Sequence, residues 1–319
     1  TQVRMMIGNA DLVILLSPEK ETNVAINLSN PPGKQFVFSG QYATINNEWC
    51  QPELITKIPP VYSDGDLLDS IVGISANEFK KRCINQYKRY VTHNNAQLQF
   101  SEDTRTLANL SSAFDCLENL QATHYCLQTA YQKKENITRE QAFAAFLDVY
   151  LPDDFHNYLK DFPVNHPLAL YCYNYRNVVM DLYDTHKDPL AYEKNLLKNA
   201  PLTKEEETLI HQYETAFKAG ISFQQGSELM ALSAKYFKEN DLFRWESFSK
   251  AKERLSNIIQ DSTSLIVDYI RAIYMRSSFY NLQPLTPRQE LMASEITNPI
   301  FLGIIQDMNR QMQPRQQTI

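Results

Sequence analysis

The sequence predicts a mainly α-helical protein, an irregular multi-helix body preceded by a small N-terminal antiparallel β region. Two observations lead to this prediction. Turn sequences divide the first 60 residues into short apolar segments, whereas later segments carry apolar residues at helical spacing. Several later segments also match the capping box, which marks helix starts. We expect a β-rich region over residues 1–62, a helical domain over 63–310 and a flexible tail over 311–319.

The β-rich region contains three predicted strands, at residues 11–16, 23–28 and 35–38. Turn compositions separate them, Ser17-Pro18-Glu19 after the first strand and Asn30-Pro31-Pro32-Gly33 after the second. The middle segment alternates polar and apolar residues, which is typical of a half-buried strand. We expect one small antiparallel sheet that ends before the Pro59-Pro60 pair.

The helical domain is punctuated by start and stop signals. Capping boxes begin at Ser75, Thr138, Thr203 and Thr286. Gly220 is suited to end a helix because glycine adopts the left-handed conformation without strain. With the apolar periodicity, these signals predict helices near residues 67–72, 75–92, 103–133, 138–149, 153–161, 167–186, 189–199, 203–219, 227–238, 241–259, 262–280 and 287–310.

Composition restricts the classes of function. The chain has no glycine between Gly73 and Gly220, which argues against phosphate-cradling loops and nucleophile elbows in that part. A net charge of -6 argues against general nucleic-acid binding. No apolar run approaches the roughly 18 residues that cross a bilayer. We therefore expect no nucleic-acid partner, no transmembrane segment and no cofactor.

The predicted helix over residues 75–92 carries both an apolar and a basic side. Its apolar residues share one side, at Phe79, Cys83, Tyr87 and Tyr90. Four basic residues lie away from that side, at Lys81, Arg82, Lys88 and Arg89. In an acidic chain this side can attract an acidic protein or anionic lipid headgroups. The alternative is an ordinary solvated helix surface.

Two short patterns keep an enzyme open as the alternative. Asp64-Gly65-Asp66 is an Asp-x-Asp sequence, which in glycosyltransferases binds a divalent cation and sugar-nucleotide phosphates, although Asp-Gly is also an ordinary turn sequence. Cys83 and Arg89 satisfy Cys-x5-Arg, the minimal pattern of phosphatases with a thiolate nucleophile, although Cys83 also fits a helix core. The histidine and cysteine spacing predicts no metal site.

Arg271 is a candidate of a different kind. Helical domains that stimulate small GTPases can insert an arginine that stabilises charge on the transferred phosphoryl group. Arg271 falls on the polar side of the helix predicted over residues 262–280. Pairing with Asp268, three residues earlier, is the alternative role for this side chain.

In composition the chain resembles effector domains that intracellular bacteria deliver into host cells. It is rich in Asn, Gln, Lys and Tyr, and it contains only 8 glycines. The resemblance implies a cytosolic location and a host protein or membrane as target. The leading hypothesis is a helical interaction domain that acts on a host trafficking or signalling protein, with a small GTPase as candidate partner. Peripheral contact with anionic lipid is the second candidate interaction.

Overall fold

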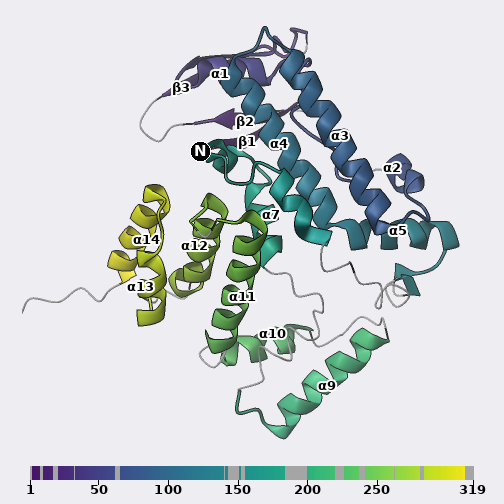
Figure 1. Cartoon of the computed structure of the whole chain (residues 1–319), viewed down its shortest axis with the longest axis vertical. Coiled ribbons are helices and arrows are strands. Elements are labelled where there is room, and N and C mark those ends of the chain that lie inside the picture. Colours follow the sequence, from purple (N-terminus) through teal and green to yellow (C-terminus); the bar gives the residue numbers. More distant parts are fainter. Residues whose placement is uncertain are drawn as a thin grey trace, which may run out of the picture. The chain divides into compact units, whose positions relative to one another are not determined.

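The structure is a computed structural model that describes the chain except for residues 1, 8–9, 17–20, 32, 62–64, 140, 143–150, 152–154, 184–199, 220–225, 237–240, 262, 281–283 and 313–319. The protein is mainly α-helical, as predicted, with short antiparallel strands near its N-terminus (Figure 1). It divides into two compact units. The first comprises Thr1–Lys134 and Asp161–Val178, and the second comprises Glu135–Lys160 and Val179–Ile319.

The strands form two antiparallel hairpins. In one, β1 (Gln2–Ile7) pairs with β2 (Ala10–Leu15), and in the other β3 (Thr22–Ile26) pairs with β4 (Phe36–Gly40). The predicted strands are confirmed as β2, β3 and β4, but the described strands form two two-stranded sheets instead of one. β1 was not among the predicted strands. The Gly8-Asn9 sequence between β1 and β2 is the turn signal that could have found it.

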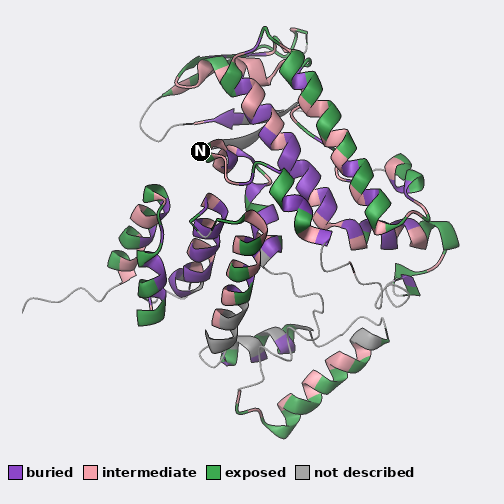
Figure 2. Cartoon of the chain, in the orientation of Figure 1, coloured by how far each residue is buried: buried purple, intermediate pink, exposed green. Residues whose placement is uncertain are grey.

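The helices of the first unit pack in part on α4, which contacts α1, α3 and η3. They are α1 (Ala43–Trp49), α2 (Gly65–Ser70), α3 (Ala76–Ala96), α4 (Glu102–Gln121) and α5 (Thr123–Glu135), followed by the 3-10 helix η3 (Pro167–Tyr171) and the start of α7 (Tyr175–Tyr183). Figure 2 shows α4 buried along much of its length. The rings of Phe114 on α4 and Tyr175 on α7 meet edge to face, with centroids 5.0 Å apart. α4 is therefore the central helix of the first unit, and its buried residues include both apolar and polar side chains.

Asparagine side chains connect the strands to α1. Asn46 accepts a hydrogen bond from the Leu15 N–H at 2.8 Å and donates to the Leu15 carbonyl at 3.1 Å. The next residue, Asn47, makes the same two bonds to Phe38, at 2.8 and 2.9 Å. A carboxamide has one acceptor oxygen and an N–H donor, so it can pair with both groups of a strand residue. Each asparagine therefore occupies part of a strand edge.

Residues 55–60 lie outside helices and strands, and together with Val61 we call them the strap. Side chains of the helices hold the strap by the same kind of hydrogen bond. Asn94 on α3 accepts from the Ile55 N–H and donates to the Ile55 carbonyl, both at 2.9 Å. Ser112 on α4 also donates to that carbonyl, at 3.2 Å. Asn94 is fully buried. The strap is thus joined to α3 and α4 at its first residue.

Two further side chains of α4 hold the rest of the strap. The Asp115 carboxylate accepts from the Ile58 N–H at 2.6 Å. Asn119, one turn later, accepts from the Val61 N–H at 2.8 Å and donates to the Pro59 carbonyl at 3.3 Å. Residues four apart share a helix face, so α4 presents its polar side chains in a row along the strap.

These bonds explain why the compact units do not follow the predicted boundary at residue 62. The strands and the strap are bound to α1, α3 and α4, so they belong to the same unit as these helices. The change in composition at Pro59-Pro60 marks the end of the extended segments. It does not mark the end of a compact unit.

The second unit contains the 3-10 helix η2 (Phe155–Asp161, whose last residue belongs to the first unit), the end of α7, and α9 (Lys204–Lys218), α10 (Gly226–Lys235), α11 (Asp241–Ile259), α12 (Leu265–Tyr280), α13 (Pro287–Ser294) and α14 (Pro299–Met312). The rings of Phe248 on α11 and Tyr274 on α12 are stacked with centroids 4.9 Å apart. Glu206 on α9 accepts from Lys235 at 2.6 Å and from the Tyr236 hydroxyl at 2.7 Å, which connects α9 to α10.

Two predicted long helices are each divided in the structure. The helix predicted over residues 103–133 becomes α4 and α5, because the Thr123 hydroxyl bonds to the Leu120 carbonyl at 2.6 Å and competes with the helical amide there. The helix predicted over 287–310 becomes α13 and α14. Asn298 begins α14, since its side chain accepts from the N–H groups of Ile300 and Phe301.

Other predicted segments are matched only in part. Residues 153–161 and 167–171 contain the 3-10 helices η2 and η3 in place of α-helix, and α1 was not predicted. Most of 138–149 and all of 189–199 lie outside the described residues. Of the predicted tail, residues 311–312 belong to α14 and residues 313–319 lie outside the described part.

We predict that Asn94→Ala destabilises the first unit by about 1 to 3 kcal/mol, because the half-buried Ile55 N–H loses its acceptor and the Ile55 carbonyl keeps only the bond from Ser112. Urea unfolding followed by Trp49 fluorescence in a Trp245→Phe background measures this change. The control is Asn85→Ala, at an exposed position of the same helix. Equal unfolding midpoints for the two variants would show that the bonds to Ile55 contribute nothing.

Candidate functional site

α3 is a rigid support for the side chains on its outer surface. The Ser75 side chain accepts from the Glu78 N–H at 3.2 Å and caps the helix, as predicted. Phe79 and Cys83 are buried on the inner side, and the Tyr87 ring stacks on Phe162 with centroids 4.9 Å apart. Together with Asn94 near the other end, these contacts fix the helix at several points along its length.

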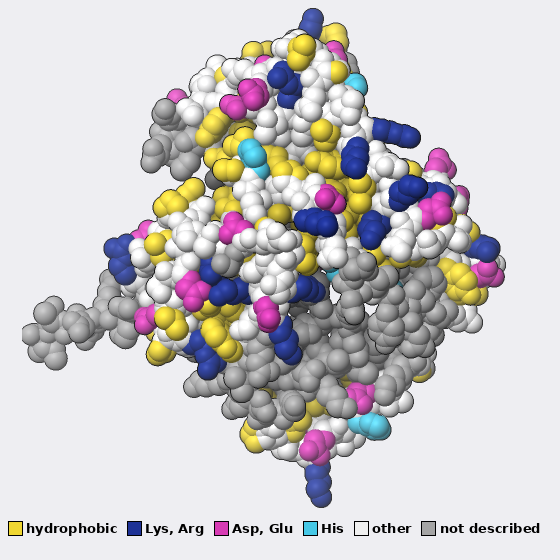
Figure 3. Space-filling view, viewed as in Figure 1, with side chains coloured by type: hydrophobic (Ala, Val, Ile, Leu, Met, Phe, Trp, Pro, Cys, Tyr) yellow, Lys and Arg dark blue, Asp and Glu magenta, His cyan; other side chains and the backbone are white. Residues whose placement is uncertain are grey.

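The structure places the four predicted basic residues on the exposed side of α3, where Figure 3 shows Lys and Arg side chains on the surface. Arg82 differs from the other three. Its guanidinium donates to the Ser70 carbonyl at 2.7 Å and pairs with Glu78 at 2.8 Å. Arg82 therefore connects α2 to the start of α3, and its charge is already balanced by a carboxylate.

Lys81, Lys88 and Arg89 are the basic side chains that remain available, and we call them the basic face of α3. Among the residues that the structure describes, none of the three has an acidic side chain within ion-pair distance. Lys81 and Lys88 are seven residues apart, so they point in nearly the same direction. The basic face therefore carries three positive charges in a protein of net charge -6.

The phosphatase interpretation of Cys83 and Arg89 is wrong. Both residues lie within the continuous helix α3, and their directions differ by about 120° at 3.6 residues per turn. The backbone N–H groups between them are used by the helix and are not turned toward a phosphate. Burial, with a smaller contribution from Cys126, raises the pKa of the Cys83 thiol to about 12, so it is protonated and unreactive at neutral pH.

The Asp-x-Asp pair is only half described. Asp64 lies outside the described residues, and Asp66 is exposed in the first turn of α2. An acidic side chain at that place is favoured by the helix dipole. Lys133 on α5 bonds to the Gly65 carbonyl at 3.3 Å and pairs with Asp69 at 2.7 Å. Within the described part of the chain, no three His, Cys, Asp or Glu side chains are grouped as metal ligands would be.

The sequence pattern placed Arg271 on the polar side of its helix, but the structure places it in the interior. It is buried on α12 and pairs with Asp268 at 2.7 Å, which confirms the alternative role. Its second terminal nitrogen contacts Glu295 at 3.1 Å. The other Asp268 oxygen accepts from the N–H groups of Thr297 and Asn298, at 3.0 and 2.8 Å. This network joins α12 to the start of α14 and gives Arg271 a structural role.

Asp115 is a buried titratable group that the sequence did not single out. Its two oxygens accept from the Ile58 N–H at 2.6 Å and from the Asn174 side chain at 2.7 Å. Burial raises its pKa from 3.8 to about 6, against the opposing effect of these two hydrogen bonds. Its position between apolar residues of α4 gave no sequence signal, because its partners lie more than 50 residues away.

Comparison of the chain with protein-family models, curated proteins and solved structures finds no match. Among the described helices, none has both the length and the hydropathy to cross a bilayer. The basic face is a group of exposed charges without described acidic partners.

We predict that acidification affects the first unit through Asp115. Because its pKa is higher in the folded state, about 6 instead of 3.8, the folded state binds the extra proton between these values. The contribution of Asp115 to stability is therefore greatest below pH 4 and is lost as pH rises through 6. Urea unfolding of wild type and Asp115→Asn from pH 4 to 7.5 measures it as the difference between the two curves. A difference that does not change with pH would contradict the assignment.

Proposed function

We propose that this chain is an interaction domain that docks an acidic partner through the basic face of α3. The observation that carries the proposal is the exposure of Lys81, Lys88 and Arg89 without carboxylate partners in the described part of the chain. Basic side chains on an acidic protein are commonly balanced locally, as Arg82 is by Glu78. The three residues of the basic face retain their full charge for a ligand.

Rigidity supports this proposal. The basic face lies on a helix held by Asn94, Phe79 and Tyr87, so the backbone that carries it needs little ordering when a partner binds, and only the side chains lose freedom. Charges gathered on one side of such a helix orient the encounter with a complementary surface and raise the association rate. The contacts available to the basic face are electrostatic, and the expected interaction is weakened by salt.

The compositional resemblance favours a cytosolic trafficking or signalling protein as the partner, and a small GTPase belongs to this class. Binding, and not catalysis, is the proposed role toward it. The guanidinium of Arg271 is buried and paired, which argues against an inserted catalytic arginine at that position.

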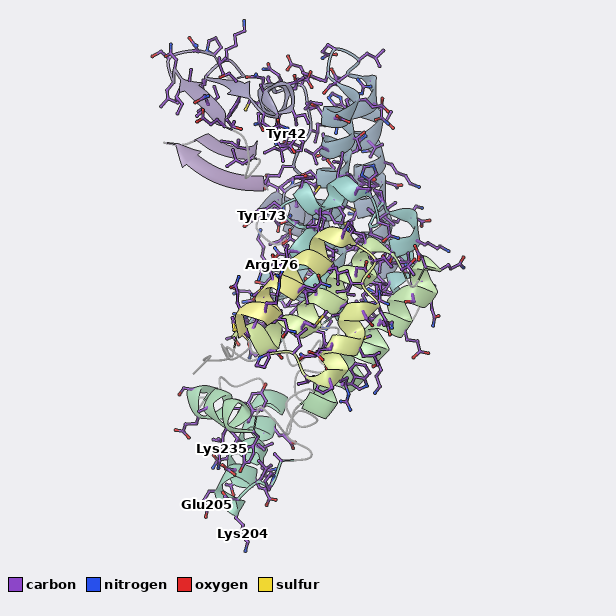
Figure 4. All side chains as sticks on the ribbon, turned by 90° about the vertical axis from the view of Figure 1, so that its left-hand side faces the viewer. Tyr42, Tyr173, Arg176, Lys204, Glu205 and Lys235 are labelled. Atoms are coloured by element: carbon purple, nitrogen blue, oxygen red, sulfur yellow. The ribbon has the colours of Figure 1, made fainter. Side chains whose placement is uncertain are left out.

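We predict that Lys81→Glu, Lys88→Glu and Arg89→Glu together abolish capture of specific proteins from eukaryotic cytosol. The control carries Lys34→Glu, Arg176→Glu and Lys204→Glu, three exposed positions outside α3, and has the same change in net charge. Figure 4 labels two of them, Arg176 on α7 and Lys204 on α9.

Quantitative mass spectrometry of the captured proteins compares both variants with wild type, at low and high salt. The proposal requires proteins that wild type and control retain, that the α3 variant loses, and that high salt releases. Identical captured sets for the two variants, with both folded by circular dichroism, would contradict it.

A further inference from the structure

We infer that the partner presents an acidic α-helix to the basic face of α3, with carboxylates on one side of that helix. This inference rests on the proposed function and names the kind of surface that is bound. It follows from the spacing of Lys81, Lys88 and Arg89, from the short residues between them, and from the weak attraction that three charges alone have for a membrane.

The spacing of the basic face matches a second helix. Lys81 and Lys88 are two turns apart, which is about 10 Å along the axis at 1.5 Å per residue. An acidic helix lying along α3 repeats this distance between its own residues i and i+7, which point in nearly the same direction. Arg89 is turned by about 100° from Lys88, so its planar guanidinium faces the flank of such a helix and can hold a carboxylate with two hydrogen bonds.

An extended strand does not fit this spacing. In a strand a distance of about 10 Å corresponds to three residues at 3.3 Å each, and residues three apart point to opposite sides. Only one of two such carboxylates would face α3. The alternating directions of a strand therefore satisfy Lys81 or Lys88, but not both.

A membrane is also a poor match for the basic face. Each lysine or arginine near an anionic bilayer contributes about 1 kcal/mol, so three supply about 3 kcal/mol, a roughly hundredfold preference that salt reduces further. Interfacial helices gain most of their binding by inserting apolar side chains. Among the described residues, none of the exposed large hydrophobic side chains belongs to α3, whose Phe79 and Cys83 are buried in its own core.

The centre of the basic face is compatible with close packing of a helix. Asn85 lies between Lys81 and Lys88 in sequence and is exposed, and Thr92 follows one turn after Lys88. The Thr92 hydroxyl bonds back to the Lys88 carbonyl at 2.9 Å, so this side chain lies against its own helix. Short polar residues of this kind allow two helix axes to approach while the long basic side chains reach across.

The test uses two crosslinked, fluorescent helical peptides of equal composition and charge. One carries four glutamates in a single stripe at i, i+4, i+7 and i+11, and the other carries them distributed around the helix. Vesicles with phosphatidylserine and a phosphoinositide form the third probe. Anisotropy and co-sedimentation measure binding to wild type, to the α3 charge-reversal variant and to the control variant that retains α3.

We predict that the striped peptide binds wild type and control at least tenfold more tightly than the distributed peptide, and that the α3 variant loses this preference. Equal binding of the two peptides, or binding to vesicles alone that depends on α3, would overturn the acidic-helix inference while the proposed docking role of α3 stands. If neither peptide nor vesicles bind, and cytosolic capture is the same for both variants, then the inference and the proposed function both fail.

Discussion

Side-chain carboxamides that pair with the backbone of extended segments are the interaction on which the first unit depends. Asn46, Asn47, Asn94 and Asn119 each make bonds to both an N–H and a carbonyl of the extended chain. Two-stranded hairpins and single extended segments have backbone groups that a larger sheet would satisfy. Here the helices supply the missing partners. Because Asn94 belongs to α3, the same interaction that fixes the strap also fixes the helix that carries the basic face.

In the second unit, a buried carboxylate and its arginine partner hold the backbone ahead of α14. Asp268 lies on α12 and accepts from two backbone N–H groups ahead of α14, while Arg271 balances its charge. Removing one partner of a buried ion pair leaves the other charge unpaired in the interior, which is strongly unfavourable, so Asp268 and Arg271 depend on each other. In both units a buried polar side chain determines where an extended or terminal segment attaches. The charges of the basic face are different, because no described acidic residue pairs with Lys81, Lys88 or Arg89.

Local features could be predicted from the sequence, and distant pairings could not. The capping boxes at Thr138, Thr203 and Thr286 are confirmed by reciprocal bonds, since each depends on residues three positions apart. The exposure of Lys81 and Lys88 followed from helical periodicity in the same way. The bonds from Asn46 to Leu15 and from Asn119 to Val61 join residues 31 and 58 positions apart, and no periodic pattern reports them. The periodicity of α12 likewise placed Arg271 on its polar side. That pattern could not report the contact with Glu295, which lies 24 residues further along the chain.

Native-state amide hydrogen exchange tests the central claim most directly. The amides of Ile55, Ile58 and Val61 donate to side chains of α3 and α4, which are their acceptors in place of backbone carbonyls. If these bonds hold the unit together, the three amides exchange only when the unit opens, and as slowly as amides in the middle of α4. The Ser29 amide is the internal comparison, because it also bonds to an asparagine side chain but is exposed. Exchange of Ile55, Ile58 and Val61 as fast as that of Ser29 would contradict the account.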